Sequence, residues 1–295
     1  MRILIAVPVF NEERYVLPVM REIRKYARAA AIAHGVEMRV LVIDDGSTDA
    51  TPEKLRELAA RGQVQVLTHP ENRGYGQSLI DAFDYAARHA FDWVITMDCD
   101  EQHEPCRIPL FVRRCLEAEA EGGADVISGS RYLRHTAGPM EEGSPPPDRR
   151  NINHIMTDLL NSTLNLHVLP PCLGCPELRD APPAETGLES PGITDAFCGF
   201  KAHRVSAMER MDLTIPGYAF PMQFWVQAAS LNLVIREMPV KLIYKDATRH
   251  FGGLLDDPTA RLHHYLEVLT GEIRRSREKM EAAATVCGQA ECLCE

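Results

Sequence analysis

Apolar and polar positions alternate in a regular way along the first 130 residues. Short runs rich in Ile and Val are separated by longer amphipathic stretches, a pattern typical of repeated strand–helix–strand units on a parallel sheet. The apolar runs predict strands at residues 2–7, 39–43, 64–68, 93–97 and 125–128. The stretches between them predict helices at about 12–31, 52–61, 75–89 and 106–121. Pro52 and Pro105 suit first-turn positions, because proline lacks the amide hydrogen that is unpaired there.

The rest of the chain is less periodic. At 134–149 and 168–192 proline, glycine and acidic residues crowd together, which predicts two loop insertions. Apolar spacing predicts a helix at 151–166, a strand at 196–202, a helix at 221–231, one or two strands within 233–244 and an amphipathic helix at 258–284. We therefore expect a main domain of residues 1–245, followed by a loop, helix and tail at 246–295.

Composition narrows the class of protein. With 45% apolar residues, a chain of 295 residues can bury a substantial core. Its formal charge of -10 argues against a nucleic-acid partner, whose phosphates usually require a basic face. No apolar run reaches the length of about 18 residues that a membrane-spanning helix needs, so we expect membrane contact to be peripheral or through a partner. Nine cysteines without a secretory signal indicate reduced thiols and a cytoplasmic location.

The motif Asp98-Cys99-Asp100 carries the strongest chemical signal. It follows the hydrophobic run WVITM, and ligands of open α/β sheets bind beyond the carboxyl ends of the strands. Two carboxylates at this spacing offer hard oxygen ligands for Mg²⁺ or Mn²⁺ bound to a diphosphate. Such a cation would neutralise charge on a leaving nucleoside diphosphate. The alternative is a solvated acidic turn, because Asp-x-Asp occurs often by chance.

Two further polar loops follow the first and second strands. In the first loop, Phe10 is a plausible floor for a nucleotide base, and Asn11 can cap the helix that follows. In the second, the run DDGSTD at 44–49 places a carboxylate where it could accept a hydrogen bond from a base, and Gly46 permits the turn. Both loops also fit ordinary turns with helix caps.

Six motifs stand in one order along the chain: V-P-V-F-N-E-E, V-I-D-D-G-S-T-D, E-N-R-G-Y-G-Q-S, M-D-C-D-E-Q-H, I-S-G-S-R-Y and T-D-A-F-C-G-F-K. In this the chain resembles inverting glycosyltransferases of the family 2 type, most closely dolichyl-phosphate mannosyltransferases and polyprenyl-phosphate glycosyltransferases, over residues 2–245 apart from the insertions. The resemblance implies an α/β GT-A fold with a mostly parallel central sheet flanked by helices. It also implies metal-dependent transfer, with inversion, from a nucleotide-sugar of the GDP-mannose or UDP-glucose type to a polyprenyl phosphate.

The resemblance also implies roles for single residues. The nucleotide-sugar pocket would be lined by Pro8, Phe10, Glu12, Ile43, Asp44, Asp45 and Gln102. Asp98 and Asp100 would hold the cation and the diphosphate. Arg131 looks like the family's phosphate-contacting arginine, and the pair at 149–150, with Arg150 as our candidate, resembles a second one. Guanidinium groups suit phosphate oxygens of either the donor or the acceptor.

Two segments depart from the family pattern. Lys201 stands where the family usually has Arg in G-F-R, so the charge is kept and bidentate geometry is lost. Arg249 begins a segment that keeps the family's Arg and Gly and loses its Ser and Lys. Both stay candidates for phosphate binding. Asp195 is our candidate either for orienting the acceptor or for taking a proton from a hydroxyl acceptor, because a phosphate acceptor needs no strong base.

The sequence leaves four alternatives open. The acceptor could be a soluble hydroxyl compound, or the chain could be a non-catalytic nucleotide-sugar binding module. A zinc site is conceivable, because Cys172 and Cys175 have ligand spacing and Cys287, Cys292 and Cys294 lie near the end of the chain. More often such cysteines are simply surface thiols, and the chain has no second regular CxxC pair. The basic stretch at 274–279 could rest on anionic lipid headgroups or be a solvated helix face.

Overall fold

The computed structural model describes residues 1–133, 141–142, 145–170, 192–244 and 251–291. Within this part of the chain eight strands form one sheet, in the order β3-β2-β1-β4-β8-β5-β9-β7. Their bounds are β1 Arg2–Val9, β2 Glu37–Asp44, β3 Gln65–Thr68, β4 Trp93–Thr96, β5 Val126–Ser130, β7 His167–Leu169, β8 Lys201–Arg204 and β9 Val234–Pro239. Strand β8 is antiparallel to its neighbours β4 and β5, and the other pairs are parallel. A separate parallel pair joins β6 Glu141–Glu142 to β10 Leu242–Ile243.

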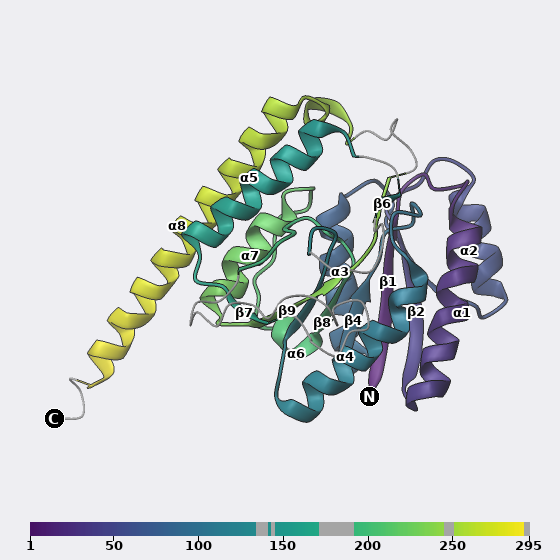
Figure 1. The fold of residues 1–295 in the computed structure, drawn as a ribbon, viewed down its shortest axis with the longest axis horizontal. Helices are drawn as coiled ribbons and strands as arrows, with labels where there is room; N and C mark the ends of the chain where they lie inside the picture. The colour runs from purple at the N-terminus through teal and green to yellow at the C-terminus, as the bar shows by residue number, and fades with distance from the viewer. Residues whose placement is uncertain (134–140, 143–144, 171–191, 245–250, 292–295) are drawn as a thin grey trace.

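Helices cover both faces of this sheet (Figure 1). Their bounds are α1 Val16–His34, α2 Thr51–Ala60, α3 Tyr75–Arg88, α4 Ile108–Glu121, α5 Pro147–Thr163, α6 Val205–Met208, α7 Phe220–Ser230 and α8 Pro258–Glu291, with 3-10 turns η1 Pro105–Arg107 and η3 Gly253–Asp256. Alternate side chains of β1 enter different cores, because successive strand residues point to opposite faces. Ile3 and Ile5 pack with α1, α2 and α4, whereas Leu4 and Ala6 pack with α3, α5, α7 and α8.

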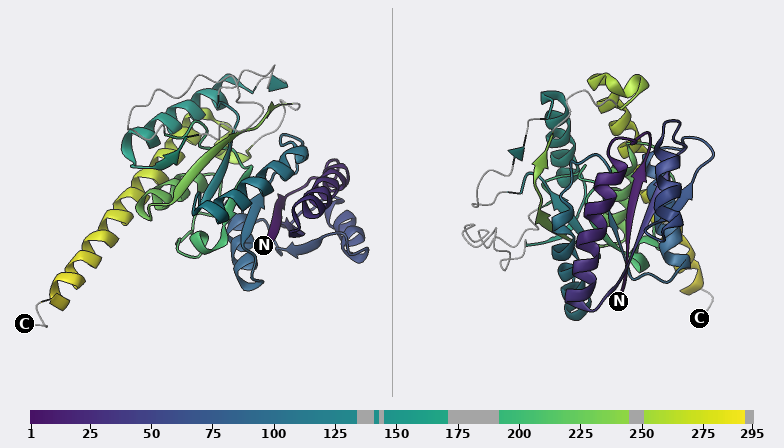
Figure 2. Two further views of the ribbon diagram at one scale, coloured as in Figure 1. Left: turned by 60° about the horizontal axis from the view of Figure 1, so that its bottom comes forward. Right: turned by 90° about the vertical axis from the view of Figure 1, so that its right-hand side faces the viewer.

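Helix α8 packs along α7 and α5 and then continues past them (Figures 1 and 2). Tyr265 and Leu269 of its first half are buried in the same core as the sheet. The expected division at residue 245 falls outside the described residues and stays a prediction. In the described part of the chain, none of the helices combines the length and the apolar character that crossing a bilayer requires.

The structure corrects three expected elements. The strand expected at 196–202 is β8 at Lys201–Arg204, because the amides of Ala196 and Phe197 donate to side chains instead of a neighbouring strand. The expected loop at 134–149 contains β6 and the start of α5, and the loop expected at 168–192 begins within β7. The other expected strands and helices are confirmed to within a few residues.

Parallel pairing brings the carboxyl ends of β1, β2 and β4 to one edge of the sheet, and β8, antiparallel to both β4 and β5, places the end of β5 at the same edge. Val9 at the end of β1 pairs with Asp44 at the end of β2, and Ala6 of β1 pairs with Thr96 at the end of β4. The loop after β2 passes very close to the backbone near residue 71 at Gly46, which has φ +72° and no side chain. A side chain at this glycine would clash with the backbone of Glu71.

We expect Gly46→Ala to lower the free energy of unfolding by about 2 to 4 kcal/mol, because it adds a backbone clash to an unfavourable left-handed conformation. Gly62→Ala is the matched control: its φ is +63°, and no atom lies within 4 Å of the added carbon. That variant should lose only about 1 kcal/mol. Denaturant unfolding measures both, and equal losses would contradict the close approach.

Candidate active site

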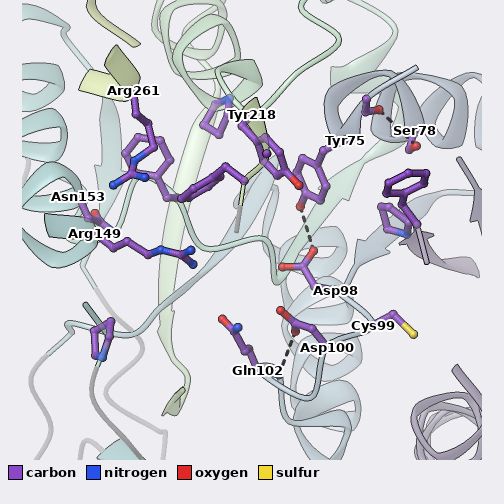
Figure 3. A pocket seen from close by; sticks show the side chains of 18 of the residues that line it. Tyr75, Ser78, Asp98, Cys99, Asp100, Gln102, Arg149, Asn153, Tyr218 and Arg261 are labelled. Atoms are coloured by element: carbon purple, nitrogen blue, oxygen red, sulfur yellow. Dashed lines mark hydrogen bonds between the residues drawn. The ribbon is translucent and has the colours of Figure 1, made fainter. Parts of the chain in front are cut away.

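A cavity of about 640 Å³ opens at the sheet edge where β1, β2, β4 and β5 end. Residues that directly follow these strands form its wall, together with the first turns of α3 and α5 and the segment around the start of α8. The expected site residues that line it are Pro8, Phe10, Glu12, Asp45, Asp98, Asp100, Gln102 and Arg131. Figure 3 shows Asp98, Asp100 and Arg149 facing this common space. The structure therefore brings most of the expected residues together in one cavity.

Asp98 is held from three sides at the exit of β4. The Tyr75 hydroxyl donates to Oδ1 of Asp98 at 3.1 Å, and the backbone amide of Asp98 donates to Nδ1 of His103 at 3.0 Å. Burial lowers the pKa of His103, which favours the neutral ring that can accept this bond. Gly199 lies so close that an added Cβ would be 2.8 Å from an Asp98 oxygen. Gly199 of the G-F-K segment therefore packs directly against the carboxylate.

Asp100 stands on a tight turn beside Asp98. Its Oδ1 accepts the amide of Gln102 at 3.0 Å, and Glu101 between them has φ +61°, a conformation that non-glycine residues rarely adopt. No group of three or more His, Cys, Asp or Glu that could hold a metal occurs among the described residues. Magnesium usually takes only one or two carboxylates and completes its shell with substrate phosphates and water. Two aspartates on this turn fit that donor set.

The loops after β1 and β2 fasten each other. Asn11, with φ +56°, accepts the amide of Thr48 at 2.8 Å, and the Glu13 carboxylate accepts the amide of Ala50 at 3.2 Å, just ahead of α2. The expectation that Asn11 caps its own helix was wrong, because α1 begins after Tyr15 and has no side-chain cap. Its amide group serves the neighbouring loop instead. Phe10 is left 44% exposed on the cavity side.

Asp45 fixes a third loop. Its carboxylate accepts the amides of Arg73 and Gly74, both at 2.8 Å, and Oδ1 lies 2.6 Å from Nδ1 of His69. The other ring nitrogen of His69 lies 2.8 Å from Asp81. Three bonds leave Asp45 little capacity for a ligand, since a carboxylate has about four acceptor sites. Sequence reasoning missed His69, because a single histidine carried no spacing signal.

Ile43 and Asp44 do not line the cavity, contrary to expectation. Ile43 is fully buried, because successive strand residues point to opposite faces and its side chain enters the core on the face covered by α3, α5, α7 and α8. Asp44 is 1% exposed and accepts the amide of Ser47 at 3.1 Å, so its carboxylate shapes the turn.

Arg131 and Asp195 form an ion pair at the exit of β5, in which the Asp195 side chain is fully buried and that of Arg131 is 20% exposed. The guanidinium donates at 2.7 and 2.9 Å to the two carboxylate oxygens, and Asn153 of α5 donates at 2.8 Å. Burial raises the pKa of Asp195, but the Arg131 charge outweighs it and lowers the pKa to about 2. Asp195 is fully buried and does not line the cavity, contrary to expectation, so its carboxylate can orient Arg131 but cannot contact an acceptor or take a proton from it.

Glu237 of β9 supports this pair from behind. It accepts the amide of Thr194 at 2.8 Å and the hydroxyl of the same residue at 2.7 Å. The Asp195 amide also points to it, at 3.3 Å. Burial raises the pKa of Glu237 to about 7, although the bonds from Thr194 oppose the shift.

The second arginine of the cavity is Arg149, and not Arg150. Successive helix residues point about 100° apart, so only one of the two faces the cavity. Lys201 also fails to line it: its ammonium donates to the carbonyl oxygen of Cys198 and lies 5.4 Å from the Trp225 ring centre. A lysine committed to a backbone carbonyl cannot replace the expected phosphate contact.

Some expected residues lie outside the described part of the chain. They are Arg249, Cys172, Cys175, Cys292 and Cys294, and the side chain of Cys287. The zinc hypothesis therefore stays a prediction. Cysteines 99, 106, 115 and 198 are free thiols.

The structure adds lining residues that the sequence did not indicate. Tyr75, Tyr218, Phe251 and Arg261 come from α3, from the approach to α7 and from the C-terminal segment. They meet only through tertiary packing, so no local spacing marked them.

Glu237 gives a pH-dependent prediction. In the folded protein the Glu237 carboxyl has a pKa of about 7, whereas its ordinary pKa is 4.5. The neutral carboxyl therefore contributes to the stability of the folded state fully below pH 4.5, and this contribution is lost as the pH rises through 7. We expect Glu237→Gln to match the wild type near pH 4 and to exceed its free energy of unfolding by about 2 to 3 kcal/mol at pH 8. Denaturant unfolding across this range is the measurement, and a difference that does not vary with pH would refute the assignment.

Comparisons with known proteins agree with this geometry. The model of glycosyl transferase family 2 matches residues 4–170. Polyprenol monophosphomannose synthase of Mycolicibacterium smegmatis is 27% identical over 245 residues, 81% of this chain and 76% of that protein. Dolichol-phosphate mannosyltransferase of Pyrococcus furiosus is 30% identical over 134 residues, 45% of this chain and only 34% of that protein.

A solved structure shares the fold. Glucosyl-3-phosphoglycerate synthase from Mycobacterium tuberculosis, crystallised with phosphoglyceric acid, matches with a TM-score of 0.58 at 16% identity, over 92% of this chain and 80% of that one. The expected α/β GT-A fold is thereby confirmed. Because the family model covers more than half of the 295 residues, the chain belongs to glycosyl transferase family 2 and is a glycosyltransferase.

Proposed function

We propose that this chain transfers a sugar from a nucleotide diphosphate-sugar to a polyprenyl phosphate with the help of a divalent cation. The observation that carries the proposal is that one cavity contains the Asp98–Asp100 turn together with the side chains of Arg131 and Arg149. The turn suits a cation-bound diphosphate, and the arginines suit a second phosphate. The names of the relatives from M. smegmatis and P. furiosus support a lipid acceptor of this class.

Asp98 and Asp100 would hold Mg²⁺ or Mn²⁺, and the cation would neutralise the charge of the leaving nucleoside diphosphate. The donor base would lie against Phe10, on the loop that Asn11 fastens. GDP-mannose and UDP-glucose are the donors that we propose to try first.

The acceptor phosphate would lie against Arg149, with Arg131 oriented by Asp195 in the same cavity. Its oxygen is ionised near neutral pH and can attack without a general base, which agrees with the absence of proton-transfer geometry at Asp195. One displacement at the anomeric carbon would invert its configuration. Because the acceptor is a membrane lipid, the proposal requires peripheral contact with the bilayer.

Arg149 and Arg150 provide a matched pair for testing the acceptor. We expect Arg149→Gln to raise KM for undecaprenyl phosphate about tenfold or more, since a charge-assisted hydrogen bond contributes about 1.5 to 3 kcal/mol. KM for the donor should change less than about twofold, and Arg150→Gln should change neither. The assay follows radiolabel from GDP-mannose or UDP-glucose into the lipid fraction. Label that enters only soluble hydroxyl acceptors would overturn the lipid assignment.

Asp100→Ala tests the cation. We expect turnover to fall roughly a hundredfold or more while the protein stays folded, because the charge stabilisation supplied by a metal amounts to several kcal/mol. Mn²⁺ with the donor should raise the Tm of the wild type and not that of the variant. Asp84→Ala, a surface change on α3, is the control. An unchanged rate in Asp100→Ala would remove the metal role from this turn. Tight metal-dependent binding by the wild type without turnover would favour a binding module instead.

A further inference from the structure

A row of aromatic side chains leads away from the Asp98 carboxylate along the cavity wall (Figure 3). Tyr75 donates to Asp98 and stacks on Tyr218, with ring centres 5.9 Å apart and an angle of 11° between the planes. Tyr218 in turn meets Phe251 edge to face, at 5.1 Å and 87°. The three rings therefore form one continuous surface.

The far end of this row is basic. The guanidinium carbon of Arg149 lies 4.5 Å from the centre of the Phe251 ring, and that of Arg261 lies 4.6 Å from it. Arg261 pairs with Asp148 and donates at 2.9 Å to the carbonyl oxygen of Leu255, so it fixes this end of the cavity. Arg149 lines the cavity, and in the proposed function its guanidinium binds the acceptor phosphate.

Tyr218 therefore occupies the middle of the row, between the carboxylate turn and Arg149. It is 39% exposed, although Tyr75 and Phe251 contact its ring. It stands in the turn between Gly217 and the start of α7, and its side chain lines the cavity. An exposed aromatic face in a cavity is a surface for apolar ligand groups.

The transferred group must lie between the two phosphates that react. A hexose in its ring form has one face of C–H groups, and such a face packs on an aromatic ring through apolar burial and weak C–H contacts. We propose that the Tyr218 ring is the platform for the donor's hexose and thus a determinant of donor affinity. This inference rests on the proposed function, because it places the hexose of a nucleotide-sugar donor between the carboxylate turn and the acceptor phosphate at Arg149; its binding test needs the donor alone.

Calorimetry can distinguish the contribution of the sugar to donor affinity from that of the nucleoside diphosphate. With Mn²⁺ present, GDP and GDP-mannose, and UDP and UDP-glucose, are titrated into the wild type and into Tyr218→Leu. We expect Tyr218→Leu to weaken the nucleotide-sugar about fivefold, within the range of about 0.5 to 1.5 kcal/mol for an aromatic contact, and to leave the nucleoside diphosphate unchanged. Tyr218→Phe keeps the ring and should bind like the wild type.

Two controls protect the interpretation. Thermal unfolding of each variant shows whether it is folded, and Tyr85→Leu removes a tyrosine of α3 that does not line the cavity. Equal weakening of the diphosphate and the nucleotide-sugar would overturn the inference in favour of a contact with the nucleotide. Unchanged donor affinity with a raised KM for undecaprenyl phosphate would overturn it in favour of the lipid chain.

The two proposals fail in different ways. If the Tyr218 effect on donor binding is seen and no label reaches undecaprenyl phosphate, the hexose platform stands and the lipid acceptor fails. If label reaches the lipid and Tyr218→Leu binds the donor normally, the platform fails alone. A wild type that binds none of the four nucleotides would contradict both.

Discussion

The parallel register of β1 with β2 and β4 determines where the chemistry can occur. It aligns the strand ends so that the residues after Val9, Asp44 and Thr96 meet at one edge of the sheet. Each loop is then held by bonds to another: Asn11 to the loop after β2, and Asp45 to the segment that opens α3. Carboxylates far apart in sequence thereby share one cavity.

A second set of contacts joins this edge to the later half of the chain. Asp195 is fully buried against the partly exposed Arg131, and a buried charge overcomes its desolvation cost only when its partner and further hydrogen bonds satisfy it. Asn153 provides one such bond, and Glu237 holds the adjacent backbone. These hydrogen bonds join α5 and β9 to the exit of β5, so the elements that carry Arg131 and Arg149 are connected to each other.

Sequence patterns predicted what depends on local periodicity and on strand ends. The strands, most helices and the Asp98–Asp100 turn follow from these rules, and the family resemblance supplied Arg131. The strand at 196–202 was wrong because its apolar residues resemble a strand, whereas Asp195 and the backbone beside it bond to side chains. Arg150 was preferred to Arg149 because the phase of a helix cannot be fixed from its loop-rich start. Tyr218 depends on contacts between distant segments, which no pattern along the chain records.

The account depends on a cation joining the Asp98–Asp100 turn to the donor diphosphate. The most direct test is a crystal structure with Mn²⁺ and a nucleotide-sugar, using anomalous scattering to locate the metal. We expect one peak within coordination distance, about 2.0 to 2.3 Å, of oxygens from Asp98 or Asp100 and from the diphosphate. A bound nucleotide-sugar whose diphosphate lies away from this turn, or Mn²⁺ at another place, would contradict the account.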